Sequence, residues 1–376
     1  MTLSRRSLLR TLPASLPALL PTLVPPLLPA SFGLLASGAL AQGGQPASIA
    51  LDALMTAARK EGRVTSLGMP DDWANWRATW ADLQRLYGLA HVDTDMSSAE
   101  EIAKIEAEKS NASADLGDVG FEFGAIAKAR GITQPYKPTT WAQVPDWAKD
   151  ADGHWALAYT GTIAFAVNRK RLPDVPRSWQ ALFASKARVM IGEVGRAAQS
   201  NAAVLAAAVA LGGDETMLLP ALAAFARIAK DKRLIGTNAT PALMERAEAD
   251  VFLLWDFNAL SYRAKLPNAA DYEVLIPSDG SITSGYTTIL NRWAPHPNAA
   301  MLAREYIFSD AGQMNLARGH ARPIRIAQLP LPADLKALLV PEAQYAKARA
   351  LKPAVWTEEV KKLPRAWQRE VLGAAR

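Results

Sequence analysis

The chain has 376 residues, of which 50% are hydrophobic and 21% are charged, and its formal net charge at pH 7 is +6. It contains no cysteine, which excludes disulfides, thiolate metal sites, a cysteine nucleophile and a lipoprotein anchor. The composition is that of an ordinary globular protein, and the length indicates two domains or lobes.

The N-terminal segment has the features of an export signal. The paired arginines Arg5 and Arg6 are followed by apolar residues, and no acidic side chain occurs before Leu35. This order is typical of a twin-arginine signal peptide, and the small residues ahead of Gln42 predict cleavage after Ala41. We therefore interpret residues 1–41 as a cleaved signal and expect the twin-arginine export machinery as a partner.

A transmembrane anchor is the alternative reading of the same segment, because it is long and apolar enough to approach the thickness of a bilayer. Prolines argue against an anchor, since each removes a helix hydrogen bond that a lipid-exposed helix cannot easily replace. They are Pro13, Pro17, Pro21, Pro25, Pro26 and Pro29.

Cleavage of the signal also changes the charge of the protein. Loss of the three signal arginines lowers the net charge of the mature chain to about +3 (6 − 3), which is too mild to indicate a nucleic-acid partner. We expect a free periplasmic protein.

After a polar linker, strands and helices alternate in the first third of the mature chain. The apolar spacing predicts helices that begin near residues 51, 71, 98 and 123, the third of them opened by a capping box of Ser98 with Glu101. Between them, β-prone runs predict strands over residues 64–67, 91–96 and 114–120. This alternation predicts a parallel sheet with helices on both faces.

Ligands of such sheets bind beyond the carboxyl ends of the strands. The polar residues expected at that edge are Asp71, Ser98 and Asp118, and Trp73 accompanies them. Trp73 also has a structural interpretation, because its spacing with Trp76 matches a buried helix face.

A second alternating set follows an irregular stretch over residues 134–153. A long uncharged run predicts a strand over residues 155–168 that could bridge two bodies. Further strands are expected at 188–191, 250–255, 272–277 and 285–290, and helices at 200–211, 215–230, 298–309 and from 310 onward. The pattern predicts two α/β lobes with a binding cleft between them.

Three motifs occur in a fixed order along the mature chain. They are the Ala-Asp strand at residues 114–120, the strand at 159–168 followed by Pro173, Pro176 and Ser178-Trp179, and the strand at 285–291 followed by residues 297–300, 306–309 and Gly312-Gln313. Together they resemble the extracellular solute-binding proteins of ABC importers, and they come closest to the branch that handles polyamines, ferric iron, phosphonates and sugar phosphates.

The resemblance implies a two-lobed type II periplasmic-binding-protein fold, with a mixed sheet flanked by helices in each lobe. It implies crossings between the lobes near Thr160, Thr283 and Arg322, so that lobe 1 comprises residues 45–159 plus 283–322 and lobe 2 comprises 160–282 plus 323–376. The implied function is capture of a small polar or charged solute and its delivery to a permease in the inner membrane. We expect a monomer without a cofactor.

The candidate ligand contacts of the second lobe leave the charge of the solute open. Trp255 and Asp256 follow an apolar strand, and a carboxylate beside aromatic rings can pair with a cation. An equally good interpretation is that Asp256 caps the start of the helix that follows it. Arg196 and Asn201 lie at the start of an alanine-rich helix, where backbone amides favour an anion. Thr160 and Tyr286 complete the predicted ligand-binding residues.

The sequence gives little support for a metal or an enzyme. The four histidines have no metal spacing, and no adjacent tyrosines are present to hold ferric iron. No Gly-x-Ser-x-Gly or phosphate-loop motif occurs. We therefore predict no metal site, no catalytic residue and no enzymatic activity. The alternative is an exported hydrolase or lyase that uses Asp118 and Asp256 as acid and base.

Overall fold

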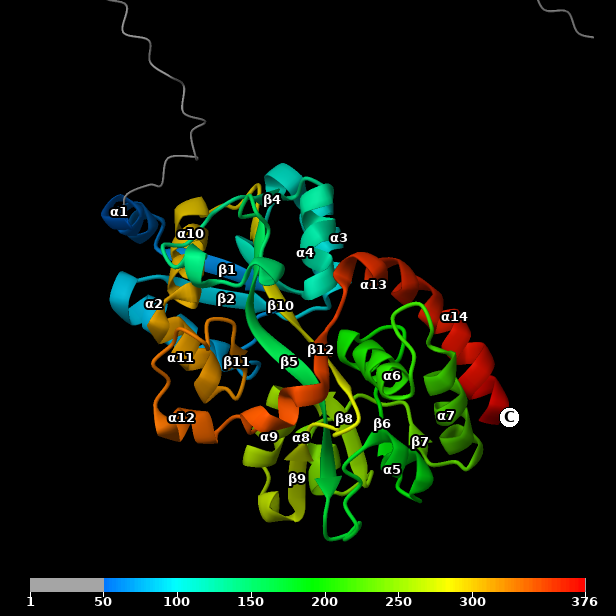
Figure 1. The fold of residues 1–376 in the computed structure, drawn as a ribbon. Coiled ribbons are helices and arrows are strands. Elements are labelled where there is room, and N and C mark those ends of the chain that lie inside the picture. The colour runs from blue at the N-terminus through cyan, green and yellow to red at the C-terminus, as the bar shows by residue number, and fades with distance from the viewer. Residues whose placement is uncertain (1–50, 376) are drawn as a thin grey trace, which may run out of the picture. The chain divides into compact units, whose positions relative to one another are not determined.

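The computed structural model describes residues 51–375. The predicted signal peptide and its cleavage after Ala41 lie outside the described residues. Residues 51–375 form a mixed α/β structure with two lobes, each a sheet flanked by helices, as expected from the sequence (Figure 1). Among these residues no helix is long and apolar enough to span a membrane.

The first lobe is built on the strand order β2-β1-β3-β10-β5, in which β5 is Trp155–Asn168 and β10 is Ser281–Asn291. β1 pairs parallel with β2 and with β3, whereas β10 runs antiparallel to both β3 and β5, so the sheet is mixed. Its strands are β1 (Arg63–Leu67), β2 (Ala90–Thr94), β3 (Leu116–Gly120) and the short β4 (Thr133–Gln134). Its helices are α1 (Leu51–Glu61), α2 (Trp76–Tyr87), α3 (Ser98–Glu108), α4 (Phe121–Ala129), α10 (Pro297–Phe308) and α11 (Asp310–Arg318).

The second lobe continues from the far half of β5 in the order β5-β8-β6-β7, with β9 also paired to β5. Its strands are β6 (Val189–Met190), β7 (Leu234–Ile235), β8 (Val251–Trp255) and β9 (Tyr272–Leu275). Its helices are α5 (Trp179–Ala184), α6 (Ala198–Ala210), α7 (Leu219–Lys230), α8 (Pro241–Glu245) and α9 (Asp256–Ala264). The alanine-rich α6 is almost wholly buried because small side chains let the neighbouring elements approach closely.

Two long strands connect the lobes. β5 (Trp155–Asn168) pairs with β10 (Ser281–Asn291) up to Thr162, and from Ile163 onward it pairs with β8 (Figure 1). The hydroxyls of Thr162 and Thr283 lie 2.7 Å apart and join the two strands by a hydrogen bond. A short third strand, β11 (Arg322–Pro323), pairs with β5 at the same level. The passage between the lobes is therefore a hydrogen-bonded group of strands.

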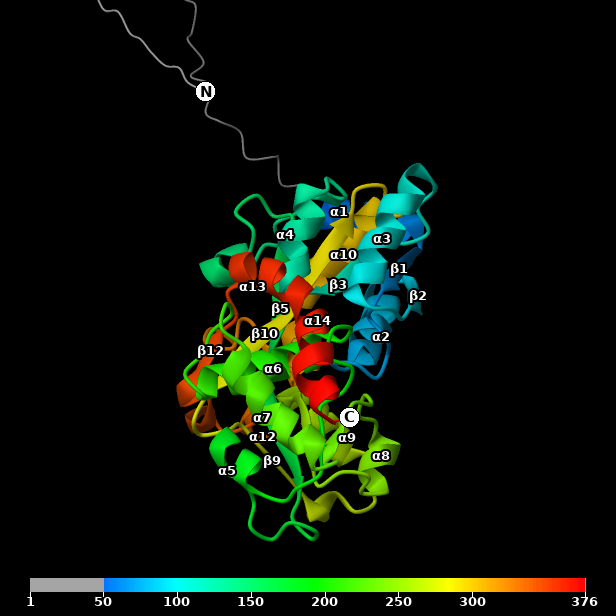
Figure 2. The ribbon, with the colours of Figure 1, turned by 90° about the vertical axis from the view of Figure 1, so that its right-hand side faces the viewer.

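The C-terminal residues 348–375, here called the C-terminal strap, contact both lobes. The strap comprises β12 (Ala348–Ala350), α13 (Pro353–Glu359), α14 (Leu363–Trp367) and short turns, and it follows α12 (Ala333–Ala337). β12 pairs with β10, α13 packs against α4 of lobe 1, and the end of the strap packs against α7 of lobe 2 (Figure 2). The bidentate pair of Arg349 with buried Glu215 attaches the strap to lobe 2.

Two local expectations were wrong. The second helix begins at Trp76 and not near Asp71, because Ala74 and Asn75 have positive φ values of 47° and 60° and interrupt the helical backbone. The capping box of α3 is formed by Ser97 and Glu100, with the Ser97 amide donating to the Glu100 carboxylate at 2.9 Å. The capping residues therefore lie one position earlier than predicted, and the side chain of Glu101 is buried in the protein interior and does not cap the helix.

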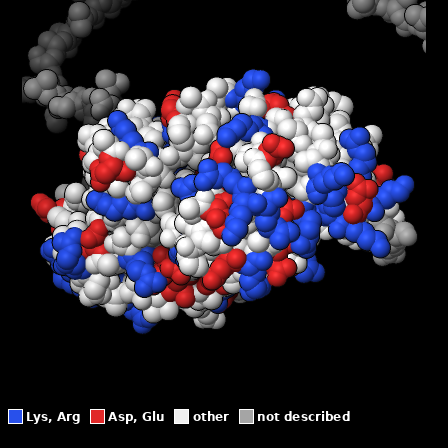
Figure 3. All heavy atoms as spheres, turned by 90° about the horizontal axis from the view of Figure 1, so that it is seen from below, with Lys and Arg blue, Asp and Glu red and all other residues white. Residues whose placement is uncertain are grey.

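Charged side chains of both signs are mixed over the surface that is seen from below in Figure 3. Ion pairs of the described residues include Arg171 with Asp250 and Arg177 with Glu273, each at 2.8 Å.

Replacement of Gly285 by alanine is expected to destabilise the strand crossing. A Cβ at this position would lie 2.3 Å from the backbone oxygen of Tyr159, and a backbone atom cannot rotate away. We expect a loss of about 1–3 kcal/mol or more in the free energy of unfolding, measured by urea denaturation. Gly236→Ala is the matched control, because its Cβ would lie 3.9 Å from the nearest atom. Equal stabilities of the two variants would contradict the prediction.

Candidate functional site

A small pocket lies between the lobes, beside the carboxyl ends of β3 and β8. Its volume of about 10 Å³ is room for about one water molecule and far below the range of about 300–1,000 Å³ that is typical of ligand sites. Each lobe and the C-terminal strap contribute walls. The lining residues are Gly120, Glu122, Ser284, Gly285 and Tyr286 from lobe 1 and the crossing, Ala198, Ala202 and Trp255 from lobe 2, and Leu351 and Trp356 from the strap.

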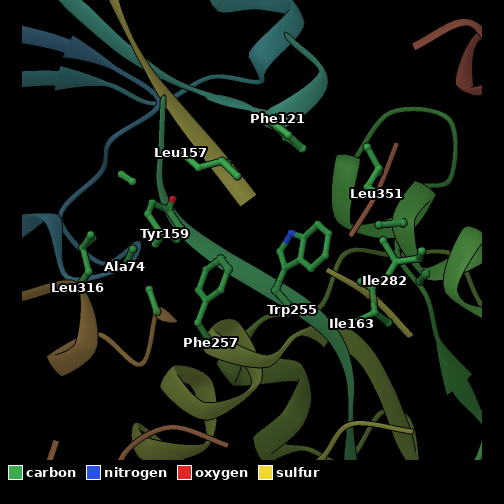
Figure 4. Close-up of a cluster of buried hydrophobic side chains, with 14 of the residues drawn as sticks. Ala74, Phe121, Leu157, Tyr159, Ile163, Trp255, Phe257, Ile282, Leu316 and Leu351 are labelled. Carbon is green, nitrogen blue, oxygen red and sulfur yellow. The ribbon is translucent and has the colours of Figure 1, made fainter. Parts of the chain in front are cut away.

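A cluster of aromatic rings continues from the pocket along β5. The ring of Trp73 lies edge-on to Phe257 and to Tyr286, with centroid distances of 5.2 and 5.4 Å. Tyr159 stacks on Tyr286 at 5.7 Å and lies edge-on to Phe257 at 5.5 Å. Figure 4 shows Tyr159, Phe257 and Trp255 following one another along β5. We call Trp73, Tyr159, Trp255, Phe257 and Tyr286 the aromatic cluster.

Asp118 is joined to this cluster by a chain of hydrogen bonds. The Trp73 indole N–H donates to the Tyr159 hydroxyl at 2.7 Å, and that hydroxyl donates to Asp118 Oδ2, also at 2.7 Å. Asp118 is 2% exposed, and its Oδ1 has no hydrogen-bond partner among residues 51–375. Burial raises the pKa of Asp118 to about 8, although the bond from Tyr159 opposes the shift.

Further carboxyl groups of lobe 1 lie near Asp118. Glu101 is buried between Gly68 and Gly117, where a Cβ on either glycine would lie within 2.5 Å of its carboxyl oxygens. Burial raises the pKa of Glu101 well above its usual value, and the charges of Asp118 and Asp93 add to this rise. Asp93 Oδ1 accepts from the amide of Met69 at 3.0 Å, while its Oδ2 has no partner within the described range. Lobe 1 thus brings several carboxyls to one strand edge.

Glu122 is the acidic residue that lines the pocket itself. It lies in the first turn of α4 and is 7% exposed. Burial raises its pKa, and it forms no ion pair within residues 51–375. No lysine, arginine or histidine is among the residues that line the pocket in the described part of the chain. The negative charge of an ionised Glu122 therefore has no basic neighbour in the wall.

Lobe 2 supplies an indole and its supports. Trp255 ends β8, is 2% exposed, and its Nε1 has no hydrogen-bond partner in the part that the structure describes. Gln199 Oε1 accepts from the Trp255 amide at 2.8 Å and from Asn258 Nδ2 at 3.1 Å, so the end of β8 is fixed to the first turn of α6. Trp255 is thereby held at the pocket wall, where its indole opposes the rise that burial causes in the pKa of Tyr286.

Asp256 is the centre of a set of hydrogen bonds at the crossing. Its Oδ1 accepts from the backbone amides of Thr162 and Phe257 at 3.0 and 2.9 Å, and its Oδ2 accepts from the Tyr345 hydroxyl at 2.6 Å. Burial raises the pKa of Asp256 to about 6, and these hydrogen bonds oppose the rise. The carboxyl binds to three different segments of the protein.

Of the residues predicted from the sequence, the structure brings Trp73, Asp118, Trp255 and Tyr286 together. Ser98 lies at the edge of this group, where its hydroxyl accepts from the Gly120 amide at 2.9 Å. Together with the pocket lining, these residues form the candidate site.

The other predicted residues lie apart from this group or support it. Asp71 is exposed and lies 3.5 Å from Arg77. Thr160 is buried in β5, opposite Gly285. Arg196 is exposed and lines a separate groove beside the strap, and Asn201 Oδ1 accepts from the Gly195 amide at 2.6 Å. The two residues proposed for an anion are therefore outside the aromatic cluster.

The acidic and aromatic residues of the site that the sequence reasoning missed are Glu122, Tyr159, Phe257 and Trp356. Glu122 follows the same strand end as Asp118, so the rule that selected Asp118 could also have selected it. Tyr159 and Phe257 lie next to residues that were selected. Trp356 carried no signal, because nothing local indicates that the strap returns to the cleft.

The described residues contain no group of three His, Asp or Glu side chains that could hold a metal ion. The site offers carboxyl acceptors from lobe 1, aromatic rings from both lobes and an indole donor from lobe 2. Such a set can bind a small solute by hydrogen bonds, charge and stacking.

The chain is similar to known proteins in sequence and in fold. Residues 112–349 match the family described as "Bacterial extracellular solute-binding protein". No curated protein sequence matches the chain.

Among solved structures, the chain is similar to the binding protein AgtB from A. tumefaciens R10 in complex with agropinic acid. The two chains share 16% identity with a TM-score of 0.66, and the match covers 83% of this chain and 99% of AgtB. It is also similar to the periplasmic binding protein AfuA from Actinobacillus pleuropneumoniae with fructose-6-phosphate bound, with 16% identity, a TM-score of 0.65, and coverage of 83% and 99%. The binding protein MotA from A. tumefaciens B6 in complex with glucopine has 17% identity, a TM-score of 0.65, and coverage of 84% and 100%. These likenesses confirm the predicted two-lobed binding-protein fold.

Proposed function

The chain belongs to the family of bacterial extracellular solute-binding proteins, and from this we propose that it is the periplasmic substrate-binding component of an ABC importer. It captures a small polar or charged solute between its lobes and delivers it to a permease in the inner membrane. The observation that carries this proposal is the narrow pocket between the lobes, which is walled by both lobes and the C-terminal strap and lined by the acidic Glu122 and the indole of Trp255.

The lobe boundaries belong to the same proposal, with residues 45–159 plus 283–322 in lobe 1 and 160–282 plus 323–376 in lobe 2. The change of partner along β5 between Thr162 and Ile163 supports them, as does the hydrogen bond from Thr162 to Thr283. Export by the twin-arginine route and a monomeric state are further parts of the proposal. Binding shifts an equilibrium between open and closed lobes by as much as the solute prefers the closed form.

Binding without turnover distinguishes a receptor from the exported enzyme. The hydrogen bonds of Asp256 to Thr162, Phe257 and Tyr345 account for a structural role, which weakens its candidacy as a catalytic acid or base. In addition, the members of the family are solute-binding proteins. We therefore propose that the protein has no enzymatic activity.

A thermal-shift screen of the mature chain tests the function. A bound solute is expected to raise the melting temperature progressively with concentration, because a ligand at 100 times its Kd adds about 2.7 kcal/mol to the stability. The panel consists of polyamines, amino acids, aminophosphonates, sugar phosphates and neutral sugars. Recovery of the solute unchanged, together with a smaller radius of gyration in small-angle scattering, supports a receptor. Conversion of the solute to a product supports the enzyme.

A further inference from the structure

The edge of lobe 2 opposite the cleft carries a concentration of positive charge. The pocket lies beside the carboxyl end of β8, whereas this edge is formed by the amino ends of β6, β7 and β8 and by the end of β5, which points to the lower end of the molecule in Figure 1. Three of its segments, residues 169–171, 186–188 and 227–233, contain nine lysines and arginines and one acidic residue, Asp231. We call these nine side chains the basic edge.

Backbone hydrogen bonds hold the ends of the four strands side by side. The Asn168 amide donates to the Asp250 carbonyl, and the Asp250 amide donates to the Arg188 carbonyl, each at 2.9 Å. The next residue, Val189, donates its amide to the Arg233 carbonyl at 2.8 Å. These bonds follow one row across β5, β8, β6 and β7, whose neighbours in a sheet lie about 4.8 Å apart. The basic edge is therefore an array on an ordered sheet edge and not a charged tail.

Most of the charge on the basic edge has no acidic partner. Arg171 pairs with the buried Asp250 at 2.8 Å, and Arg233 pairs with Asp231 at 3.1 Å. The other seven side chains are exposed and form no ion pair within residues 51–375. They are Arg169, Lys170, Lys186, Arg188, Arg227, Lys230 and Lys232.

Acidic residues on neighbouring loops reduce this charge without cancelling it. Glu273 pairs with Arg177 at 2.8 Å and Glu248 pairs with Arg246 at 3.3 Å, so neither acid opposes the basic edge. Asp174 and Asp271 lie close to residues 169–171 in the chain or in the fold and form no ion pair in the described part of the chain. The surface seen from below in Figure 3 therefore shows both signs, while the unpaired charges of the edge are mainly basic.

A groove on the same edge combines basic and apolar side chains. It has a volume of about 570 Å³. Two half-buried apolar side chains, Phe183 and Leu211, line it together with the basic Lys186, Arg227 and Arg233. Its other lining residues are Gln180, Ala184, Ser185 and Asp231. A molecule that joins an anionic group to an apolar part matches this lining.

We propose that the basic edge binds anionic phospholipids at the surface of the inner membrane, with a lipid phosphate against Lys186 and Arg227 and the adjoining apolar part of the lipid beside Phe183. Clusters of about four to eight lysines and arginines are typical of binding to anionic lipids, and each such residue near the surface strengthens binding about fivefold. A single-stranded nucleic acid fits less well, because proteins that bind it offer exposed aromatic rings, and the three segments contain none.

This interaction goes beyond solute binding. Because the basic edge lies at the end of the lobe 2 sheet opposite the pocket, a protein bound to lipid through it keeps the cleft free to exchange solute. Adsorption to the membrane then raises the local concentration of the protein beside a permease in that membrane.

Co-sedimentation of the mature chain with vesicles tests the proposal. One set of vesicles contains equal parts of phosphatidylglycerol and phosphatidylcholine, and the other contains phosphatidylcholine alone. We expect binding to the anionic vesicles to be at least tenfold tighter, and to be lost in about 1 M salt, where the Debye length is about 3 Å. A variant that combines Lys186→Gln, Arg227→Gln and Lys230→Gln is expected to bind the anionic vesicles at least tenfold more weakly.

The matched control combines Lys60→Gln, Arg63→Gln and Lys336→Gln, which remove the same charge from exposed positions outside the basic edge. This control is expected to bind like the unchanged protein, and melting temperatures show whether both variants are folded. Equal weakening in the two variants, or equal binding to the two kinds of vesicle, overturns the proposal.

Soluble anions distinguish a lipid surface from other sources of negative charge. The competitors are inorganic phosphate, glycerol 3-phosphate, a single-stranded DNA oligonucleotide and polyglutamate. We expect none of them to bind the protein more tightly than the anionic vesicles do. Tighter binding of a small phosphate, of DNA or of polyglutamate assigns the basic edge to that class of partner and overturns the lipid assignment. These outcomes leave the proposed function untouched, because solute capture is measured separately.

Discussion

Alanine in place of Trp356 is expected to lower the free energy of unfolding by about 3–5 kcal/mol, the range for removal of a large buried aromatic side chain. Trp356 is 1% exposed and belongs to the main hydrophobic core. It stands on α13 of the C-terminal strap, where it lines the pocket together with Glu122 and Tyr286. The variant therefore leaves a void at the place where strap and lobes meet.

The same substitution is expected to weaken solute binding, because one wall of the pocket is lost. The strap is attached to lobe 2 by Arg349 and Glu215 and by the edge-on contact of Trp367 with Phe225 at 5.5 Å, while its α13 packs against lobe 1. Opening of the lobes must then separate α13 from α4. Small-angle scattering of the variant with saturating solute is expected to show a larger open fraction than in the unchanged protein.

Trp147→Ala is the control for both effects. Trp147 is also a tryptophan of lobe 1, but it is 50% exposed, so its removal is expected to cost much less than removal of Trp356. Urea denaturation measures the stabilities, and calorimetry with the best solute measures the affinities. Similar losses in the two variants would show that the strap has no special role at the cleft.

Asp118 is expected to contribute a loss of stability to the solute-free protein as the pH rises from about 4 to about 8. Asp118 has a pKa of about 8 in the folded protein against a reference value of 3.8, so the folded protein holds this proton after the unfolded chain has released it. The stabilising contribution of Asp118 therefore decreases with pH across that window and is greatest below it. Each unit of pKa difference corresponds to about 1.4 kcal/mol.

Asp118→Asn is expected to remove this contribution and to leave the variant more stable than the unchanged protein at pH 8. The amide keeps an oxygen for the Tyr159 hydroxyl and carries no charge to bury. Denaturation curves at pH 5 and pH 8 measure the difference, with Asp52→Asn, which changes an exposed carboxylate on α1, as the control. Both variants keep the contribution of the buried Glu101, whose raised pKa gives the same sign, and that of His91, whose pKa burial lowers to about 4 and which gives the opposite sign. A slope unaffected by Asp118→Asn would contradict the assignment.

Local patterns in the sequence were sufficient for most elements. The run of uncharged β-prone residues at 155–168 coincides with β5, and helical apolar spacing with a following Gly62 coincides with α1. The segment at residues 71–75 was the main failure in lobe 1, because the positive φ values of Ala74 and Asn75 do not follow from residue type. No helix or strand was predicted for the C-terminal strap, because its helices are short and the elements they pack against are distant in the chain.

For the site, the sequence by itself determined the strand ends at which ligand groups should occur, and through its motifs the family and the two-lobed fold. Strand ends can be predicted from local periodicity, so Asp118 and Trp255 were accessible to that reasoning. Only the tertiary structure decided which side chains face one another. Asp256 binds to Thr162 and Tyr345, while Glu122 and Trp356 enter the pocket, because burial and hydrogen-bond partners depend on contacts between segments far apart in the sequence.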